Sequence, residues 1–180
     1  MTTTAGGPES EPDAESEAKH LTEIRRRRAE LLESITALEL ALAAPGRQER
    51  WAERVSSALS ELSSEFNDHI ELMEGPNGLN IRLIRRSPRL AHAVEALTKE
   101  HATLAGLIED LTTLVAQAQG SLERGESTER GAAMPDYPMP GGWDEVRERG
   151  TELLGALVRH RQRGADLVYE AFAVDIGGQD

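Results

Sequence analysis

Residues 90–115, LAHAVEALTKEHATLAGLIEDLTTLV, decide the fold class of this sequence. Apolar residues recur in this stretch at alternating steps of three and four, at Leu90, Val94, Leu97, Leu104, Ile108, Leu111 and Val115. Such steps return to one side of an α-helix, which has 3.6 residues per turn. The stretch therefore predicts a helix with one apolar stripe. We expect it to start near Pro88, with Ser87 as its cap.

Three further stretches carry the same period, at about 19–44, 47–74 and 143–174. The Pro and Gly residues of APGR (44–47) and GPNG (75–78) predict where the first two helices end. The connection LNIRLIRRS (79–87) has room for a short helix. Four amphipathic helices of comparable length bury their stripes most simply by packing on one another. The expected fold is all-α, an antiparallel up-down four-helix bundle.

The bundle should occupy residues 19–176 and form one domain. Residues 1–18 are mainly Gly, Pro, Ser, Thr and acidic residues, so we expect a disordered acidic tail there. Residues 119–142 are rich in Pro and Gly, which predicts a flexible loop between the last two long helices. Gly177 and Gly178 stop the last helix and leave residues 177–180 as the C-terminal end.

Composition and charge exclude several classes of function. The formal net charge of −12 argues against nucleic acid as a partner, because binding to phosphates needs a basic surface. Cysteine is absent, so any metal must be held by His, Asp or Glu. The sequence shows neither a signal peptide nor an apolar run long enough to span a membrane, so we expect a cytoplasmic protein. No nucleophile motif is present, which disfavours an enzyme.

Histidines replace apolar residues on three of the predicted stripes. His69, His101 and His160 each occupy a stripe position on a different helix, and Arg28 occupies one on the first helix. His20 and His92 fall off the stripes, and we expect them at the surface. A single histidine on an apolar stripe is usually a hydrogen-bonded core residue, but neutral imidazole is also the commonest metal ligand. Both interpretations are open for these three histidines.

The segments FNDHIELMEG (66–75), KEHATLAGLIEDL (99–111) and LVRHRQRGADLVYEAF (157–172) resemble the histidine-bearing helices of hemerythrin-like (HHE cation-binding) domains. That resemblance implies a four-helix bundle with a non-haem di-iron centre for oxygen binding, iron handling or redox sensing. His69, His101 and His160 match the leading histidines of three family motifs.

The partners of these histidines depart from the family pattern. Met73, Ala105 and Gly164 stand four residues after the three histidines, where the family has further ligands. The nearest acids are Glu74 and Asp166. Two iron ions need more ligands than this set supplies, including bridging carboxylates. We therefore expect that the di-iron centre is lost.

Two functions follow from this ligand set. In the first, the bundle binds no cofactor and is a regulatory or interaction module with a protein partner. In the second, it binds iron or zinc at a reduced site and serves as a redox or oxygen sensor, with candidate ligands His69, Glu74, His101, His160 and Asp166. The sequence does not fix the oligomeric state.

Arg28 is the residue least expected near a metal, because its guanidinium is always charged. One hypothesis pairs it with Glu74 or Asp166 inside the bundle, in the electrostatic place of the metal. The other has it extend into solvent as part of the basic run Arg25–Arg28.

Overall fold

The computed structural model describes residues 11–45, 47–124 and 142–173. Within these residues the regular structure is helical and no strand occurs, as the sequence predicts. The elements are α1 (Glu11–Ala43), α2 (Gln48–Glu74), α3 (Leu79–Arg86), a 3-10 turn η1 (Pro88–Leu90), α4 (Ala91–Glu123) and α5 (Trp143–Ala173). The all-α prediction is therefore confirmed.

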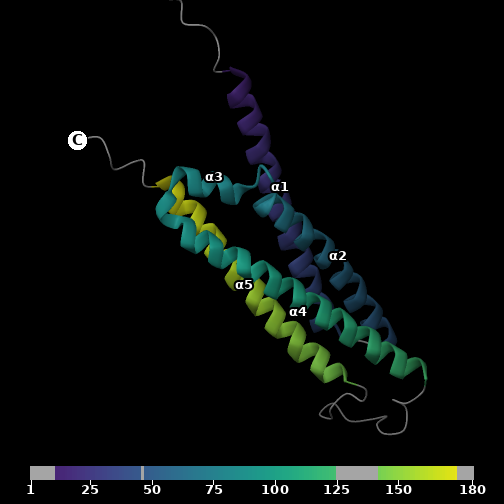
Figure 1. Ribbon diagram of the computed structural model, residues 1–180. Coiled ribbons are helices and arrows are strands. Elements are labelled where there is room, and N and C mark those ends of the chain that lie inside the picture. Colours follow the sequence, from purple (N-terminus) through teal and green to yellow (C-terminus); the bar gives the residue numbers. More distant parts are fainter. Residues whose placement is uncertain (1–10, 46, 125–141, 174–180) are drawn as a thin grey trace, which may run out of the picture.

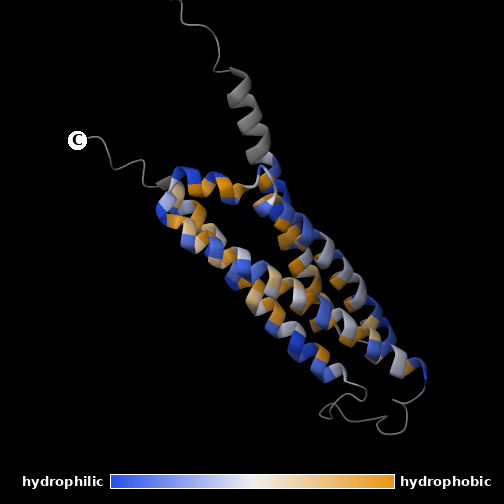
Figure 2. Cartoon of the chain, in the orientation of Figure 1, coloured by the Kyte–Doolittle hydropathy of each residue, from blue (hydrophilic) through white to orange (hydrophobic). Residues whose placement is uncertain are grey.

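The four long helices lie alongside one another and form a bundle (Figure 1). Helix α1 packs on α2, α2 on α4, α4 on α5, and α5 returns to α1. The short α3 crosses one end of the bundle between α2 and α4 (Figure 1) and contacts α2, α4 and α5. Apolar residues face inward along each helix and polar residues face outward (Figure 2). No helix in the described part of the chain is both long and apolar enough to cross a lipid bilayer.

The helix bounds differ from the expected ones mainly at two ends. Helix α1 begins at Glu11, so the helix covers residues 11–18, which were expected in the disordered tail. Residues 1–10 lie outside the described residues. Helix α4 continues to Glu123, past the predicted start of the loop at 119, because residues 119–123 contain a single glycine and no proline. The rest of that loop (125–141) and residues 174–180 lie outside the described residues.

The turn between α2 and α3 depends on glycine at Gly78. A Cβ atom at this position would lie 2.4 Å from the backbone oxygen of Met73. No side chain fits there, so the chain can turn sharply at this point and lay α3 across the end of the bundle. The connection 79–87, which has room for a short helix, contains one.

The buried residues form two separate hydrophobic clusters along the bundle axis. The larger cluster contains Leu31 and Phe66 at one limit, and includes Trp51 and Trp143, whose rings meet edge to face at 5.4 Å. The smaller cluster lies at the end covered by α3 and joins Ile24, Met73, Leu79, Leu83, Leu90, Val94, Leu97, Leu167 and Ala171. The predicted stripe residues of 90–115 are all buried. What separates the two clusters is a layer of polar side chains.

Candidate metal centre

One residue from each long helix contributes to this polar layer, which consists of Arg28, His69, His101 and His160. On every long helix, the next stripe residue in one direction along the chain belongs to the larger cluster. The next stripe residue in the other direction belongs to the smaller cluster. On α2, for example, Phe66 precedes His69 and Met73 follows it. His101 and His160 are 2% and 5% exposed, and His69 and Arg28 are partly buried. The four stripe positions that are not apolar thus share one level of the bundle.

The three imidazoles converge on one point. The Nε2 atom of His160 lies 3.1 Å from Nε2 of His101 and 3.5 Å from Nε2 of His69. One ligand nitrogen from each ring can be chosen so that all three lie within 4.8 Å of one another. Two nitrogens bound tetrahedrally to one zinc ion, at about 2.0–2.1 Å, are about 3.3 Å apart. These two distances lie on either side of this value, so the three histidines form a group that could hold a metal ion.

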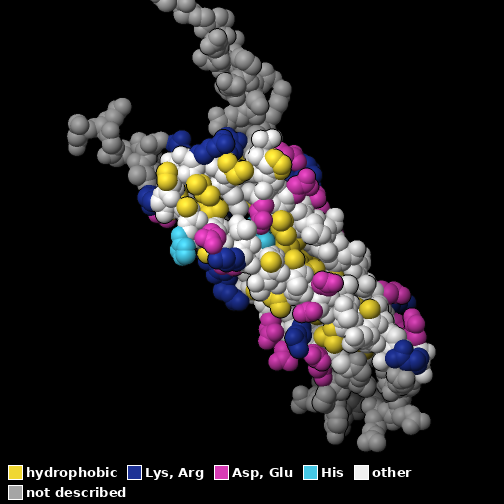
Figure 3. All heavy atoms as spheres, in the orientation of Figure 1, with side chains coloured by type: hydrophobic (Ala, Val, Ile, Leu, Met, Phe, Trp, Pro, Cys, Tyr) yellow, Lys and Arg dark blue, Asp and Glu magenta, His cyan; other side chains and the backbone are white. Residues whose placement is uncertain are grey.

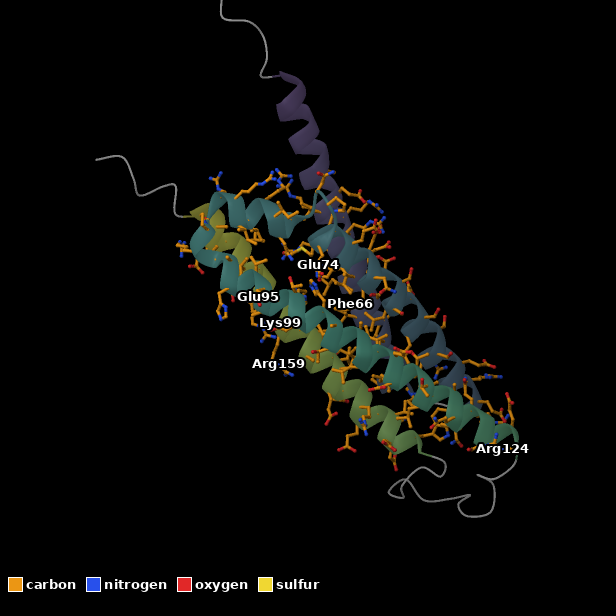
Figure 4. The ribbon with its side chains drawn as sticks, viewed as in Figure 1. Phe66, Glu74, Glu95, Lys99, Arg124 and Arg159 are labelled. Carbon is orange, nitrogen blue, oxygen red and sulfur yellow. The ribbon has the colours of Figure 1, made fainter. Side chains whose placement is uncertain are left out.

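Carboxylates orient two of the three rings by binding Nδ1, the ring nitrogen that does not face the convergence point. Glu74 binds Nδ1 of His101, and Oε2 of Glu100 lies 2.9 Å from Nδ1 of His160. Glu74 stands at the end of α2, where the chain turns toward α3 (Figure 4). A neutral imidazole that donates its Nδ1 hydrogen to a carboxylate keeps its lone pair on Nε2, which is the arrangement of metal-binding histidines. A ring that is neutral and donates from Nδ1 therefore presents an unprotonated Nε2 atom to the convergence point.

His69 is held by packing rather than by a carboxylate. Its ring stacks near the Phe66 ring, with centroids 6.0 Å apart and an interplanar angle of 27°. Phe66 lies along α2 inside the bundle (Figure 4). Among the described residues, the buried Nδ1 atom of His69 has no hydrogen-bond partner. Its Nε2 atom faces Nε2 of His160 and can bind a metal when its hydrogen is on Nδ1.

Burial favours the neutral form of His69 and His160. Loss of solvent, together with the charges of His101, His160 and Arg28, lowers the pKa of His69 to about 3. Loss of solvent also lowers the pKa of His160, although the hydrogen bond to Glu100 opposes this shift. Burial raises the pKa of Glu100, but the hydrogen bonds from Arg163 and His160 outweigh it and hold this pKa below its usual value. Neutral imidazoles and an ionised carboxylate are the states that metal binding requires.

A small cavity adjoins the convergence point. Its volume is about 40 Å³, and its wall includes the whole polar layer, Gly164, Arg161 and several apolar side chains. Gly164 follows His160 by one helical turn, at the position where the family motif would place a ligand. Because glycine has no side chain, this position leaves space beside the histidines.

The structure places some of the ligands predicted from the sequence at the site and others away from it. The structure brings His69, His101 and His160 together. It places the carboxylate of Glu74 against Nδ1 of His101, away from the convergence point. It does not bring Asp166 to this group, because Asp166 is exposed on α5, where it accepts a hydrogen bond from Gln162. Arg28 lines the cavity but, among the described residues, pairs with neither Glu74 nor Asp166. His92 is exposed, as expected, and the side chain of His20 lies outside the described residues.

Sequence reasoning missed Glu100. This residue precedes His101 directly and is off the apolar stripe, so helical periodicity assigns it to the surface. It reaches His160 on the neighbouring helix, 60 positions away along the chain. The one signal in the sequence was its place beside a stripe histidine.

Comparisons of the chain with protein-family models, curated proteins and solved structures found no match. The resemblance to hemerythrin-like domains therefore stays a prediction from the sequence.

Proposed function

We propose that this chain is a cytoplasmic metal-binding protein that holds one divalent transition-metal ion through His69, His101 and His160. In this proposal the helices alternate in direction, as in hemerythrin-like bundles, and a mononuclear site stands in place of the di-iron centre. The observation that carries the proposal is the 3.1 Å separation of the Nε2 atoms of His101 and His160.

Two unprotonated nitrogens at this distance repel each other unless a cation lies between them. In this proposal both rings are neutral and donate their Nδ1 hydrogens to Glu74 and Glu100, so both Nε2 atoms carry lone pairs. A proton on Nε2 of His160 could also relieve the repulsion, but the lowered pKa of His160 opposes this at neutral pH. A metal ion relieves it without protonation and uses the third nitrogen, from His69, as well.

The number and type of donors favour a single ion. Three neutral nitrogens converge, and the two nearby carboxylates bind the far side of the rings. Among the residues that the structure describes, no carboxylate is therefore in place to bridge two irons. Imidazole suits zinc and iron, the two metals expected from the sequence. Three protein ligands leave a fourth position open, and in zinc sites of this kind the ion acts as a Lewis acid.

A metal-free interaction module is the second candidate, and Arg28 is the observation that favours it. The guanidinium charge is close enough to His69 to lower the pKa of that ring. The same charge repels a metal cation at the polar layer. If this repulsion prevails, the polar layer would serve only to fix the alignment of the helices, and the chain would act through a protein partner.

Elemental analysis separates the two candidates. The full chain is expressed in cells supplied with zinc and iron, purified without chelator, and compared with the double variant His101→Ala, His160→Ala. We expect about one metal ion per chain in the wild type and none in the double variant. His92→Ala is the matched control, because the side chain of His92 is 95% exposed and lies on the same helix as His101. Wild-type protein that folds and contains no metal, before or after incubation with Zn²⁺, would refute the proposal.

A further inference from the structure

The cavity beside the three histidines combines a charged group with an apolar wall. Arg28 lines it together with apolar side chains from both clusters, such as Leu31 and Met73. Figure 3 shows a small area of histidine in the middle of one face, next to hydrophobic side chains. The exposed residue Arg161 also lines the cavity, so the cavity extends toward the surface. A cation facing an apolar cavity is costly unless something in the cavity compensates its charge.

The charges around the cavity add up to a positive excess once a metal is bound. The ion brings two positive charges, Arg28 and the exposed Arg161 in the cavity wall bring one each, and in the proposed site the three imidazole ligands are neutral. Glu74 and Glu100 each bring one negative charge, but Glu100 is already paired with Arg163 at 2.7 Å. Metal binding alone therefore leaves the site with more than one excess positive charge, and an anion at the open position would reduce this excess.

The cavity also limits the size of that anion. A cavity needs about 10–15 Å³ to hold one water molecule. The cavity of about 40 Å³ therefore accepts about three atoms of the size of a water oxygen. A Cβ atom at Gly164 would meet no other atom within 4 Å, so this glycine contributes part of the free space. Formate and nitrite have three heavy atoms, which fit this volume, and one negative charge, which reduces the positive excess.

We propose that the cavity is a binding site for a small monoanion of about three heavy atoms, which would contact the metal ion at one end and the guanidinium of Arg28 at the other. This inference rests on the proposed metal site and adds its ligand class. It also gives a physical reason for Arg28 in the polar layer: the charge that repels the bare metal ion attracts the anion that completes the site.

The test uses the full chain loaded with Co²⁺, whose visible absorption reports its ligands. Formate and nitrite are titrated into wild type, Arg28→Met and Gly164→Leu, and binding is also measured by calorimetry. Arg28→Met keeps a long side chain without the charge, and Gly164→Leu adds a side chain at a position of the cavity wall where a Cβ meets no other atom within 4 Å. Arg26→Met is the matched control, because Arg26 is an exposed residue of α1 that pairs with Glu23. Formamide is the uncharged probe of similar size.

We expect formate to change the cobalt spectrum of the wild type and of Arg26→Met with similar affinity. Arg28→Met should weaken formate binding at least about tenfold, the usual cost of losing one charged hydrogen bond. Its affinity for formamide should change little. Gly164→Leu should abolish the formate response, and both variants should still bind about one cobalt ion.

The outcomes distinguish this inference from the proposal on which it rests. If the wild type binds cobalt but formate leaves the spectrum unchanged, the anion site is refuted and the metal site stands. Equal formate affinity in wild type and Arg28→Met would also refute it. If folded wild type binds no cobalt, both proposals fail together.

Discussion

Acid should destabilise the metal-free fold through His69, and the size of this effect follows from burial. The folded chain holds the pKa of His69 at about 3, whereas an unfolded chain has an ordinary value near 6.5. Between these values the unfolded state takes up a proton that the folded state refuses. The stability linked to His69 is therefore complete above about pH 6.5 and is lost progressively as the pH falls toward 3.

The expected loss from this one residue, between about pH 7.5 and 5, is about 2 kcal/mol, since each pH unit below 6.5 costs about 1.4 kcal/mol. His160 adds to the loss in the same direction, because its pKa is also lowered. The range stops at about pH 5 so that carboxylates with lowered pKa values, such as Glu100, stay largely ionised in both states.

The assay is guanidinium unfolding followed by circular dichroism, with EDTA present, at several pH values in this range. His69→Gln keeps a polar side chain but does not titrate, so its stability should depend less on pH than that of the wild type, by about 2 kcal/mol over the range. His92→Gln removes an exposed histidine and should keep the wild-type dependence. An identical pH dependence in wild type and His69→Gln would show that the folded state protonates His69 as readily as the unfolded state does.

Two further predictions concern single residues. Glu100→Gln should weaken metal binding about 10- to 100-fold with little change in the fold, because the amide orients the His160 ring less strongly than the carboxylate; competition with a chromophoric chelator measures this, and an unchanged affinity would contradict the assigned role. Gly106→Ala should raise the free energy of unfolding by about 0.5–1 kcal/mol, because its Cβ meets open space on a helix. Gly150→Ala should instead lower it by about 1 kcal/mol, because its Cβ would lie 2.6 Å from Leu42 in the core. Equal unfolding midpoints for the two alanine variants would contradict this packing.

Periodicity in the sequence was enough to predict which side of each helix is buried. The predicted stripe of 90–115 is buried throughout. The short helix for which residues 79–87 had room is present as α3 (Leu79–Arg86). The start of α1 was predicted at about residue 19 rather than at Glu11. The polar composition of residues 11–18 suggested disorder, but a polar segment can extend a long helix that has already formed.

The meeting of the three histidines could not be predicted in the same way. A periodic stripe fixes the face of a helix but not its shift along the bundle axis relative to its neighbours. That shift depends on the turns, such as the one at Gly78, and on how side chains of facing helices interlock. For the same reason, the contact from Glu100 to His160 was not visible, since it depends on the relative placement of α4 and α5.

The polar layer also divides the molecule into two parts that need not unfold together. The smaller cluster, beneath α3, is separated from the larger one by side chains that contribute little apolar contact. We expect that subglobal opening of this end would expose one side of the histidines while the other cluster keeps the helices together. A ligand that joins all four helices at the boundary would couple the two parts, so amide exchange in α3 should slow when the site is filled. The bundle would then report occupancy of its interior through the dynamics of its most peripheral helix.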